Sequence, residues 1–182
     1  VYKRQSQWDA RDSGSKLNSD WDMLMKEYSK IHPKLFNELE RLINNELPND
    51  FEKHYEEFIE ELVAGDQKDL ATRKASEVCL NFFCELLPEL VGGSADLTGS
   101  NNTYSSASSE LLPENPQGNH IFYGVREFGM TAMMNGMLLH GGIKPYGGTF
   151  LVFMDYARNA VRLAALMAVS YTHLTLPTML MV

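Results

Sequence analysis

The stretch Leu90-Val91-Gly92-Gly93-Ser94-Ala95-Asp96 determines the fold class of this chain. Two apolar residues followed by small ones are typical of a short buried strand that runs into a tight turn. Residues 120–125 form a second β-rich run, and a helix is predicted over residues 127–140 before Gly141-Gly142 ends it. Strands that alternate with helices predict an α/β domain with a mostly parallel sheet, which this length of chain does not complete.

The segments on both sides of these strands are predicted to be helical. Pro145-Tyr146-Gly147-Gly148 has the composition of a turn and leads into a last helical stretch that reaches Met167. On the N-terminal side, a helix capped by Thr72 is predicted to run to Phe83. We therefore expect helices to flank the strands along the chain.

The N-terminal part of the chain has a different composition. Residues 16–66 are acidic and show helical spacing of apolar residues, with breaks at Pro33 and at Pro48-Asn49-Asp50. A linker is predicted at their end. The sequence thus divides into a helical segment over residues 16–66 and an α/β domain over residues 69–168.

The composition excludes several classes of function. Apolar residues make up 44% of the 182 residues, the share found in ordinary globular domains. The 24 Asp and Glu residues outnumber the 16 Lys and Arg residues, and the net charge of −8 disfavours binding to a phosphate backbone. No stretch approaches the roughly 18 apolar residues needed to cross a bilayer. We therefore expect neither a nucleic acid nor a membrane partner.

Cysteines and histidines do not form a metal-binding pattern. Cys79 and Cys84 lie in one apolar run without a CxxC spacing, which predicts buried, reduced thiols and a cytosolic location. Four histidines also lack ligand spacing, so we predict structural or surface roles for His32, His54, His120 and His140. No metal ligand is predicted within the chain.

The two ends of the chain are predicted to be foreign to the fold. Val1-Tyr2-Lys3-Arg4-Gln5 and Val169-Ser170-Tyr171-Thr172 can be encoded by opposite strands of one short DNA sequence. Such a pair is expected when a sequencing adapter flanks a cloned piece of DNA and is translated with it. Residues 1–5 and 169–182 are therefore set aside as adapter-derived in the interpretation of the fold.

Glu127 is the first candidate for chemistry. The run Arg126-Glu127-Phe128-Gly129-Met130 places a carboxylate where an apolar strand passes into a helix. A helix N-terminus stabilises an ionised acid whereas burial favours the neutral acid, so such a carboxylate can share a proton with a bound base. Spacing alone favours the simpler alternative, a solvated glutamate in the first turn.

Three aromatic residues form the second candidate. Phe150, Phe153 and Tyr156 recur every three residues along the last helical stretch, and three such rings can wall a flat ligand. Aromatic residues at helical spacing are more often part of a core. From the spacing alone, the core alternative therefore remains open.

Three polar residues are weaker candidates. Asp96, or the backbone amides of the Gly-Gly turn, can face a ligand, although such a turn is not by itself a phosphate-binding motif. Arg73 and Ser100 can each contact a phosphate group, and each can equally be a surface cap. These residue types alone do not decide between a site and the surface.

Taken together and in this order, these segments resemble the transketolase family. The similarity extends from about Trp21 to Met167, and several motifs in register are far more specific than any one of them. The segments that carry it are Arg73-Lys74-Ala75-Ser76, Gly92-Gly93-Ser94-Ala95-Asp96-Leu97 with Ser100-Asn101, Tyr123-Gly124-Val125-Arg126-Glu127-Phe128-Gly129-Met130, Leu139-His140-Gly141-Gly142 and Phe150-Leu151-Val152-Phe153-Met154-Asp155-Tyr156-Ala157-Arg158-Asn159-Ala160-Val161-Arg162.

The resemblance implies an incomplete thiamine-diphosphate-binding fold, namely a transketolase-like pyrimidine-binding domain preceded by a helical linker. In that family two subunits form each active site. The first domain of one subunit holds the cofactor's diphosphate and its metal ion, Mg²⁺ or Ca²⁺, and the second domain of the other holds the aminopyrimidine ring. The resemblance thus implies a homodimer in which this chain supplies the second part.

The resemblance also implies roles for the candidate residues. Glu127 is then the catalytic carboxylate that hydrogen-bonds N1′ of the aminopyrimidine. The rings that surround the aminopyrimidine are Phe150, Phe153 and Tyr156, and Asp96 lies near the centre of the cofactor. Two residues match positions that bind the sugar phosphate, Arg73 and Ser100.

The implied activity is transfer of a two-carbon ketol unit from a ketose phosphate to an aldose phosphate, in the cytoplasm and in the pentose phosphate pathway. The chain is expected to be inactive alone. Tyr171-Thr172-His173 is followed by Leu174 where the family has Asp, so His173 is given no substrate role. The alternatives are dihydroxyacetone synthase, deoxyxylulose phosphate synthase, or a non-catalytic module that pairs through its acidic helices.

Overall fold

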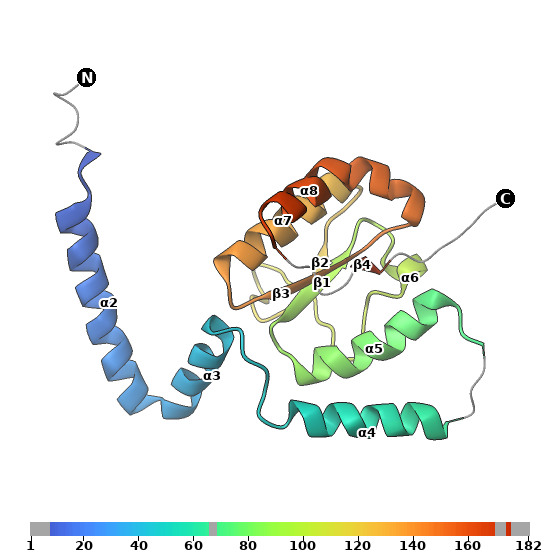
Figure 1. Ribbon diagram of the computed structural model, residues 1–182, viewed down its shortest axis with the longest axis horizontal. Helices are drawn as coiled ribbons and strands as arrows, with labels where there is room; N and C mark the ends of the chain where they lie inside the picture. The colour runs from blue at the N-terminus through green and yellow to red at the C-terminus, as the bar shows by residue number, and fades with distance from the viewer. Residues whose placement is uncertain (1–7, 66–68, 170–173, 176–182) are drawn as a thin grey trace. The chain divides into compact units, whose positions relative to one another are not determined.

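The structure is a computed structural model that describes residues 8–65, 69–169 and 174–175 (Figure 1). The chain divides into two compact units, Val1–Asn44 and Asn45–Val182. The boundary falls earlier than the end of the helical segment predicted from the sequence, because helix α4 (Phe51–Ala64) belongs to the second unit. Each unit is described by itself.

The described residues of the first unit form two long helices, α2 (Arg11–Ile31) and α3 (Pro33–Ile43), which contact each other. Pro33 occupies the first turn of α3, where its missing N–H is not needed, and it cannot continue α2. The predicted break at Pro33 is therefore confirmed.

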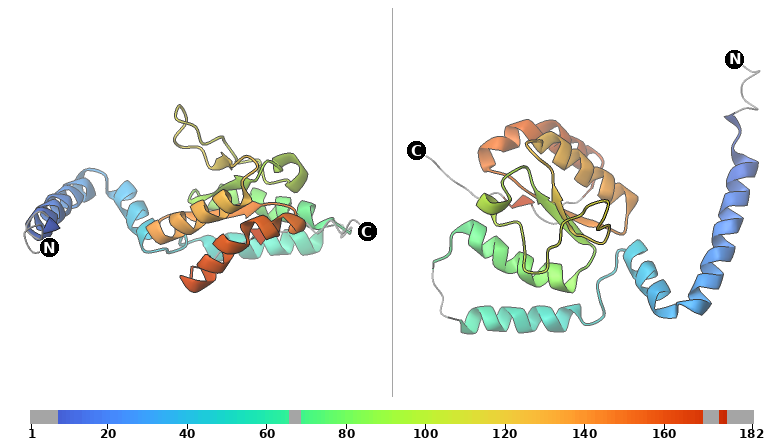
Figure 2. Two further views of the ribbon diagram at one scale, coloured as in Figure 1. Left: turned by 90° about the horizontal axis from the view of Figure 1, so that it is seen from above. Right: turned by 180° about the vertical axis from the view of Figure 1, so that it is seen from behind.

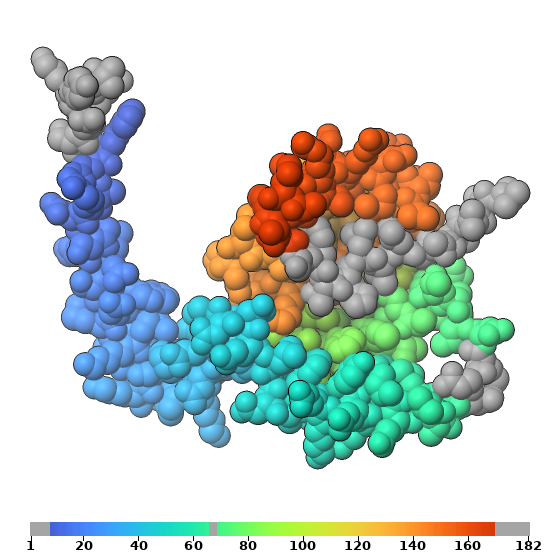
Figure 3. All heavy atoms as spheres, in the orientation of Figure 1, coloured from blue at the N-terminus to red at the C-terminus, as the bar shows by residue number. Residues whose placement is uncertain are grey.

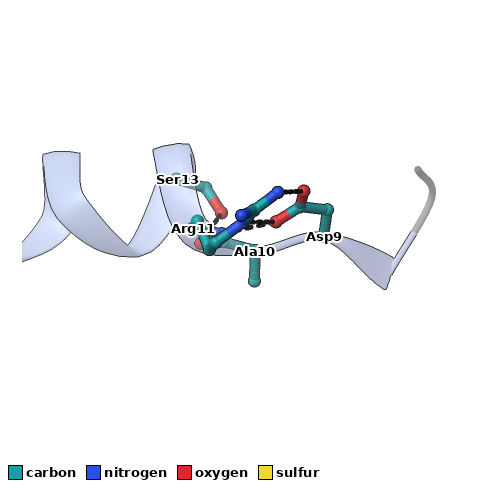
Figure 4. Close-up of polar contacts among 4 residues, drawn as sticks. All are labelled: Asp9, Ala10, Arg11 and Ser13. Atoms are coloured by element: carbon teal, nitrogen blue, oxygen red, sulfur yellow. Dashed lines mark hydrogen bonds and ion pairs between the residues drawn. The ribbon is translucent and has the colours of Figure 1, made fainter. Parts of the chain in front are cut away.

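The start of α2 carries a local polar cluster (Figure 4). The Asp9 carboxylate accepts hydrogen bonds from Nε of Arg11, at 2.8 Å, and from its backbone N–H, at 3.2 Å. These bonds lower the pKa of Asp9. Oγ of Ser13 donates to the Ala10 carbonyl at 3.0 Å. Because Asp9 and Arg11 are exposed to solvent, we attribute little stability to their pairing.

The second unit is built on a parallel sheet. Among the described residues its strands are β1 (Leu90–Ser94), β2 (His120–Phe122), β3 (Lys144–Gly148) and β4 (Leu174–Thr175), in the order β2-β1-β3-β4. Each neighbouring pair is parallel, with Gly92 of β1 opposite His120 of β2 and Tyr146 of β3. The predicted α/β class with a mostly parallel sheet is therefore confirmed.

Helices cover both faces of this sheet (Figures 1 and 2). Helix α7 (Glu127–His140) contacts β3 and packs along α8 (Met154–Leu166), which follows a 3₁₀ turn, η2 (Leu151–Phe153). On the other face, α5 (Thr72–Leu86) contacts β1. Helix α5 begins at Thr72 itself, without a side-chain cap, so the predicted capping by Thr72 is wrong.

Each face has its own core. Leu80, Cys84, Leu87, Leu90 and Tyr146 form the buried cluster under α5. Helix α4 lies beside α5 (Figures 1 and 3) and stacks on it through Phe58 and Phe82, whose ring centroids are 4.2 Å apart. The cluster under α7 consists of Ala95, Tyr123, Met130 and Met134. Burial of these apolar groups is the main stabilising contribution that the fold offers.

Strand β3 corrects one prediction. Pro145-Tyr146-Gly147-Gly148 was expected to be a turn, but it forms most of β3. A Cβ at Gly147 would lie 2.7 Å from Sδ of Met134, so a glycine lets α7 pack close to the strand. Because β4 begins opposite Gly147, Pro145 lies where no N–H is needed toward β4. Tertiary packing therefore overrides the turn propensity of this sequence.

The predicted adapter-derived ends are only partly described. Residues 1–5, 170–173 and 176–182 lie outside the described residues. Of the second predicted segment the structure describes Val169 and β4, which pairs with Gly147 and Gly148. The foreign origin of both ends stays a prediction. In the described part of the chain, no helix has the length and apolarity required to cross a membrane.

Gly92 provides a test of the sheet. A Cβ at this position would lie 2.0 Å from the carbonyl oxygen of Tyr146 and 2.6 Å from its ring. We expect Gly92→Ala to lower the free energy of unfolding by about 3 kcal/mol or more, because the strands must separate to admit the methyl group. Urea denaturation of the chain, followed by circular dichroism, measures this change. Gly99→Ala is the matched control, since nothing lies within 4 Å of its added Cβ; equal unfolding midpoints would contradict the packing described for β1.

Candidate cofactor site

A cleft with a volume of about 700 Å³ opens at the carboxyl ends of three strands. The segments that line it follow β1, β2 and β3 in turn, which is where α/β folds bind their ligands. Its lining residues are Ala95, Asp96, Leu97, Val125, Arg126, Glu127, Phe128, Phe153 and Tyr156. The cleft therefore brings together four of the residues predicted from the sequence: Asp96, Glu127, Phe153 and Tyr156.

Glu127 is the buried carboxylate of this cleft. It is the first residue of α7 and is only 7% exposed. Its side chain makes no hydrogen bond or ion pair with any residue that the structure describes, while its backbone carbonyl accepts a bond from Oγ1 of Thr131 at 2.9 Å. The alternative of a solvated first-turn glutamate is therefore wrong. A carboxylate that lines a cleft and has no partner in the described part of the chain is free to bind a ligand there.

Asp96 has an unusual backbone conformation. Its φ angle of 59° lies in the left-handed region, and its N–H donates to the carbonyl of Ser94 at 3.0 Å. Aspartate tolerates this conformation better than most residues, yet the conformation still costs free energy. Such strain is concentrated at functional sites, and here the strained residue is an exposed aspartate that lines the cleft.

The three predicted aromatic residues form a row of neighbouring rings. The centroids of Phe150 and Phe153 are 5.9 Å apart with an interplanar angle of 20°, and those of Phe153 and Tyr156 are 6.0 Å apart. The row begins beside η2, and a spacing of three residues is one turn of a 3₁₀ helix. Phe153 and Tyr156 line the cleft, whereas Phe150 contacts Phe153 and is not part of the lining. Tyr156 is 67% exposed, so the core alternative is wrong for it.

Arg73 and Ser100 do not line this cleft. Arg73 is the second residue of α5 and is half-buried, and Ser100 is exposed in the short helix α6 (Thr98–Asn101). The structure leaves their predicted contact with a sugar phosphate untested.

Sequence reasoning missed Arg126 as part of the site. Its Nη1 donates to the carbonyl of Tyr123 at 3.0 Å, and the side chain folds back over Gly124. A Cβ at Gly124 would lie 2.4 Å from this nitrogen, and the φ of Gly124 is 66°. The glycine two residues before the arginine was the available signal, because it permits both the turn and the close approach.

A second cavity, of about 600 Å³, lies between α5 and the amino-terminal ends of β1 and β3, away from the cleft. Its walls are mostly apolar, and none of the residues predicted to bind cofactor or substrate lines it. Cys79 lies at this cavity and Cys84 in the core beside it, and burial raises the pKa of Cys84, as expected for an unreactive thiol. We therefore place the candidate cofactor site in the cleft that contains Glu127.

In the described part of the chain, no group of three or more His, Cys, Asp or Glu side chains could hold a metal ion. His120 is fully buried, and burial lowers its pKa. It packs between the rings of Tyr104 and Phe122, with centroids 4.8 Å from each. This environment agrees with the predicted structural role.

Known proteins resemble this chain in sequence and in fold. Residues 68–181 match the family described as the pyrimidine-binding domain of transketolase. Transketolase 2 of Escherichia coli K12 is 51% identical over 170 residues, which are 91% of this chain and 25% of that protein. Transketolase 1 of Aliivibrio fischeri is 48% identical over 170 residues, 91% of this chain and 26% of the relative.

Solved structures of transketolases have the same fold as this chain. That of Pichia stipitis in complex with sedoheptulose-7-phosphate superposes with a TM-score of 0.74 and 37% identity, covering 85% of this chain and 23% of that one. Transketolase from Leishmania mexicana gives a TM-score of 0.74 and 38% identity, covering 85% of this chain and 22% of that one. The chain spans about a quarter of the length of the curated relatives it matches. It belongs to the transketolase family, and its α/β unit corresponds to the pyrimidine-binding domain.

Proposed function

We propose that this chain supplies the aminopyrimidine-binding half of a thiamine-diphosphate site in an enzyme that transfers a two-carbon ketol unit between sugar phosphates. The observation that carries the proposal is the presence, in one cleft, of a largely buried glutamate whose carboxylate has no partner among the described residues, together with a row of aromatic rings. Membership of the transketolase family favours this function over the related synthases and over a non-catalytic module.

The residues of the cleft fit an aminopyrimidine ring. The ring is flat and carries hydrogen-bonding nitrogen atoms at its edge, so it suits a site with aromatic walls and one polar group. Phe153 and Tyr156 provide such a wall, and Glu127 provides an unpaired carboxylate at the same cleft. When bound, thiamine diphosphate supplies a reactive thiazolium carbon that carries the two-carbon unit.

Each residue of the chain then has a distinct task. Glu127 holds a proton in a hydrogen bond to N1′ of the aminopyrimidine and so acts as a general acid–base. The aromatic row of Phe150, Phe153 and Tyr156 orients the ring and excludes water from it. Asp96 also lines the cleft, and by the family resemblance it would lie near the centre of the bound cofactor.

Arg73 and Ser100 are proposed to bind the phosphate of the sugar substrate. Solved relatives from Pichia stipitis contain sedoheptulose-7-phosphate, fructose-6-phosphate or xylulose-5-phosphate. The guanidinium of Arg73 suits a phosphate group because it donates two parallel hydrogen bonds. We propose sugar phosphates of this size as the substrates.

A homodimer is proposed for the complete enzyme. The lining residues Val125, Phe128 and Tyr156 are 76%, 48% and 67% exposed, so the cleft has a solvent-facing apolar rim. A second subunit that covers this rim would bury it and bring the diphosphate and its Mg²⁺ or Ca²⁺, held by the first domain of that subunit. A cytoplasmic enzyme of the pentose phosphate pathway is the corresponding cellular role.

A chimeric enzyme tests the proposed function. In this chimera, residues 69–168 of the chain replace the matching segment of Escherichia coli transketolase 2, with which the chain is 51% identical. We expect the chimera to transfer a ketol unit from xylulose 5-phosphate to ribose 5-phosphate, and only with thiamine diphosphate and Mg²⁺ present. A coupled assay of the product measures the rate, and the parental enzyme is the control. A folded dimeric chimera that fails to bind the cofactor would contradict the proposed function.

A further inference from the structure

Ser94 links two segments that lead to the cleft, the turn that contains Asp96 and the end of β3. It is the last residue of β1 and is completely buried. Its Oγ donates to the carbonyl of Gly148, at 2.8 Å, and accepts from Nδ2 of Asn101, at 3.0 Å, and from the backbone N–H of Leu97, at 3.2 Å. A single hydroxyl therefore bonds to three residues in two segments, residues 97–101 and strand β3.

These segments carry residues of the cleft. Leu97 closes the turn that holds Ala95 and Asp96, and all three line the cleft. Gly148 ends β3, directly before the segment that leads to the aromatic row. The Gly148 carbonyl also accepts from the N–H of Ala95, at 3.1 Å. The Asp96 turn and the aromatic row are thus tied together at Gly148.

The surroundings leave little room for another arrangement. A Cβ at position 148 would lie 2.6 Å from Cγ2 of Thr103 and 3.3 Å from Nδ2 of Asn101. Asn101 is 2% exposed, and Thr103 is completely buried. Because this packing is tight, loss of the Ser94 hydroxyl would leave the buried Nδ2 of Asn101 and the half-buried N–H of Leu97 without their acceptor.

We propose that Ser94 is a positioning residue, which fixes the distance between Asp96 and the aromatic row across the cofactor cleft. It does not line the cleft, so it acts through the turn and not by contact with a ligand. The turn needs such support because the backbone of Asp96 is held in the left-handed region. This inference rests on the proposed function.

The test compares Ser94→Ala and Asn135→Ala in the chimera. Asn135 is the matched control: it is 5% exposed, and its Nδ2 donates to the carbonyl of Ala160 at 3.0 Å, between α7 and α8 and outside the cleft lining. We expect Ser94→Ala to weaken binding of thiamine diphosphate, measured by calorimetry with Mg²⁺, by about tenfold. Asn135→Ala should lower the melting temperature without changing that affinity.

Hydrogen–deuterium exchange supplies a readout that does not depend on the cofactor. In Ser94→Ala the amides of Ala95 and Leu97 should exchange faster, whereas in Asn135→Ala they should not change. If Ser94→Ala fails to fold, Asn101→Ala removes only one of the three bonds, and a loss of affinity of about threefold is expected.

The outcomes separate the two claims. If Ser94→Ala folds and its affinity for thiamine diphosphate is unchanged, the positioning role is overturned, even if the amides exchange faster. If Ser94→Ala does not fold, an unchanged affinity in Asn101→Ala overturns it. It leaves the proposed function intact. A wild-type chimera that does not bind thiamine diphosphate overturns the proposed function, and unchanged amide exchange would then still refute the tie between the turn and β3.

Discussion

Glu127→Gln should lower kcat of the chimera by about 100-fold or more, while its affinity for thiamine diphosphate falls much less. Glutamine keeps the shape of the side chain and can still hydrogen-bond a ring nitrogen, but it cannot give up or take back a proton at N1′. Glu127→Ala removes the contact altogether and should lower both kcat and cofactor affinity. Steady-state kinetics with xylulose 5-phosphate and ribose 5-phosphate, together with calorimetric titration of the cofactor, separate the two effects.

Glu89→Gln is the matched control for this prediction. Glu89 is also a buried carboxylate, with 5% exposure, but it lies 3.9 Å from Nζ of Lys144 and outside the cleft. Its substitution should change the melting temperature and leave kcat within about twofold, because it removes a structural charge and no catalytic one. A normal kcat in a folded Glu127→Gln chimera would return Glu127 to a structural role.

The 182-residue chain alone should show no ketol transfer, even with thiamine diphosphate and Mg²⁺ added. By its resemblance to transketolases, it holds only the aminopyrimidine side of the site. Among the described residues no group of side chains could hold the metal ion that neutralises a diphosphate. The chain should therefore bind the cofactor too weakly for turnover.

The same coupled assay that is used for the chimera measures this absence of transfer. The chain must be highly purified, because a trace of host transketolase would give a false signal. An active chimera beside an inactive chain is the expected pair of results. Turnover by the chain alone that persists through successive purification steps would show that it holds a complete site.

The elements whose local sequence agrees with their tertiary role could be predicted. Helix α7 begins at Glu127 and ends at Gly141-Gly142 as expected, since the helical pattern and its terminating glycines coincide. Strand β3 was missed because Pro145, Gly147 and Gly148 favour a turn by propensity. This segment is a strand because it pairs with β1 along its whole length, and no local pattern displays that pairing.

The candidate site, too, could be predicted from the sequence only in part. The sequence shows that the aromatic residues recur every three residues, but helical spacing does not show that the row begins beside a 3₁₀ turn. The approach of Asp96, Glu127 and Phe153 depends on how three strands are ordered in the sheet. Without the resemblance to a family, neither their meeting nor the burial of Glu127 could have been predicted.

Exchange of the C2 proton of the bound cofactor reports directly on whether Glu127 acts on the aminopyrimidine of thiamine diphosphate. This exchange is followed by NMR in deuterated water, with the cofactor bound to the chimera and no sugar present. We expect Glu127→Gln to slow the exchange by about 100-fold or more at full cofactor occupancy. An unchanged exchange rate in a folded, cofactor-saturated Glu127→Gln chimera would contradict this role of Glu127.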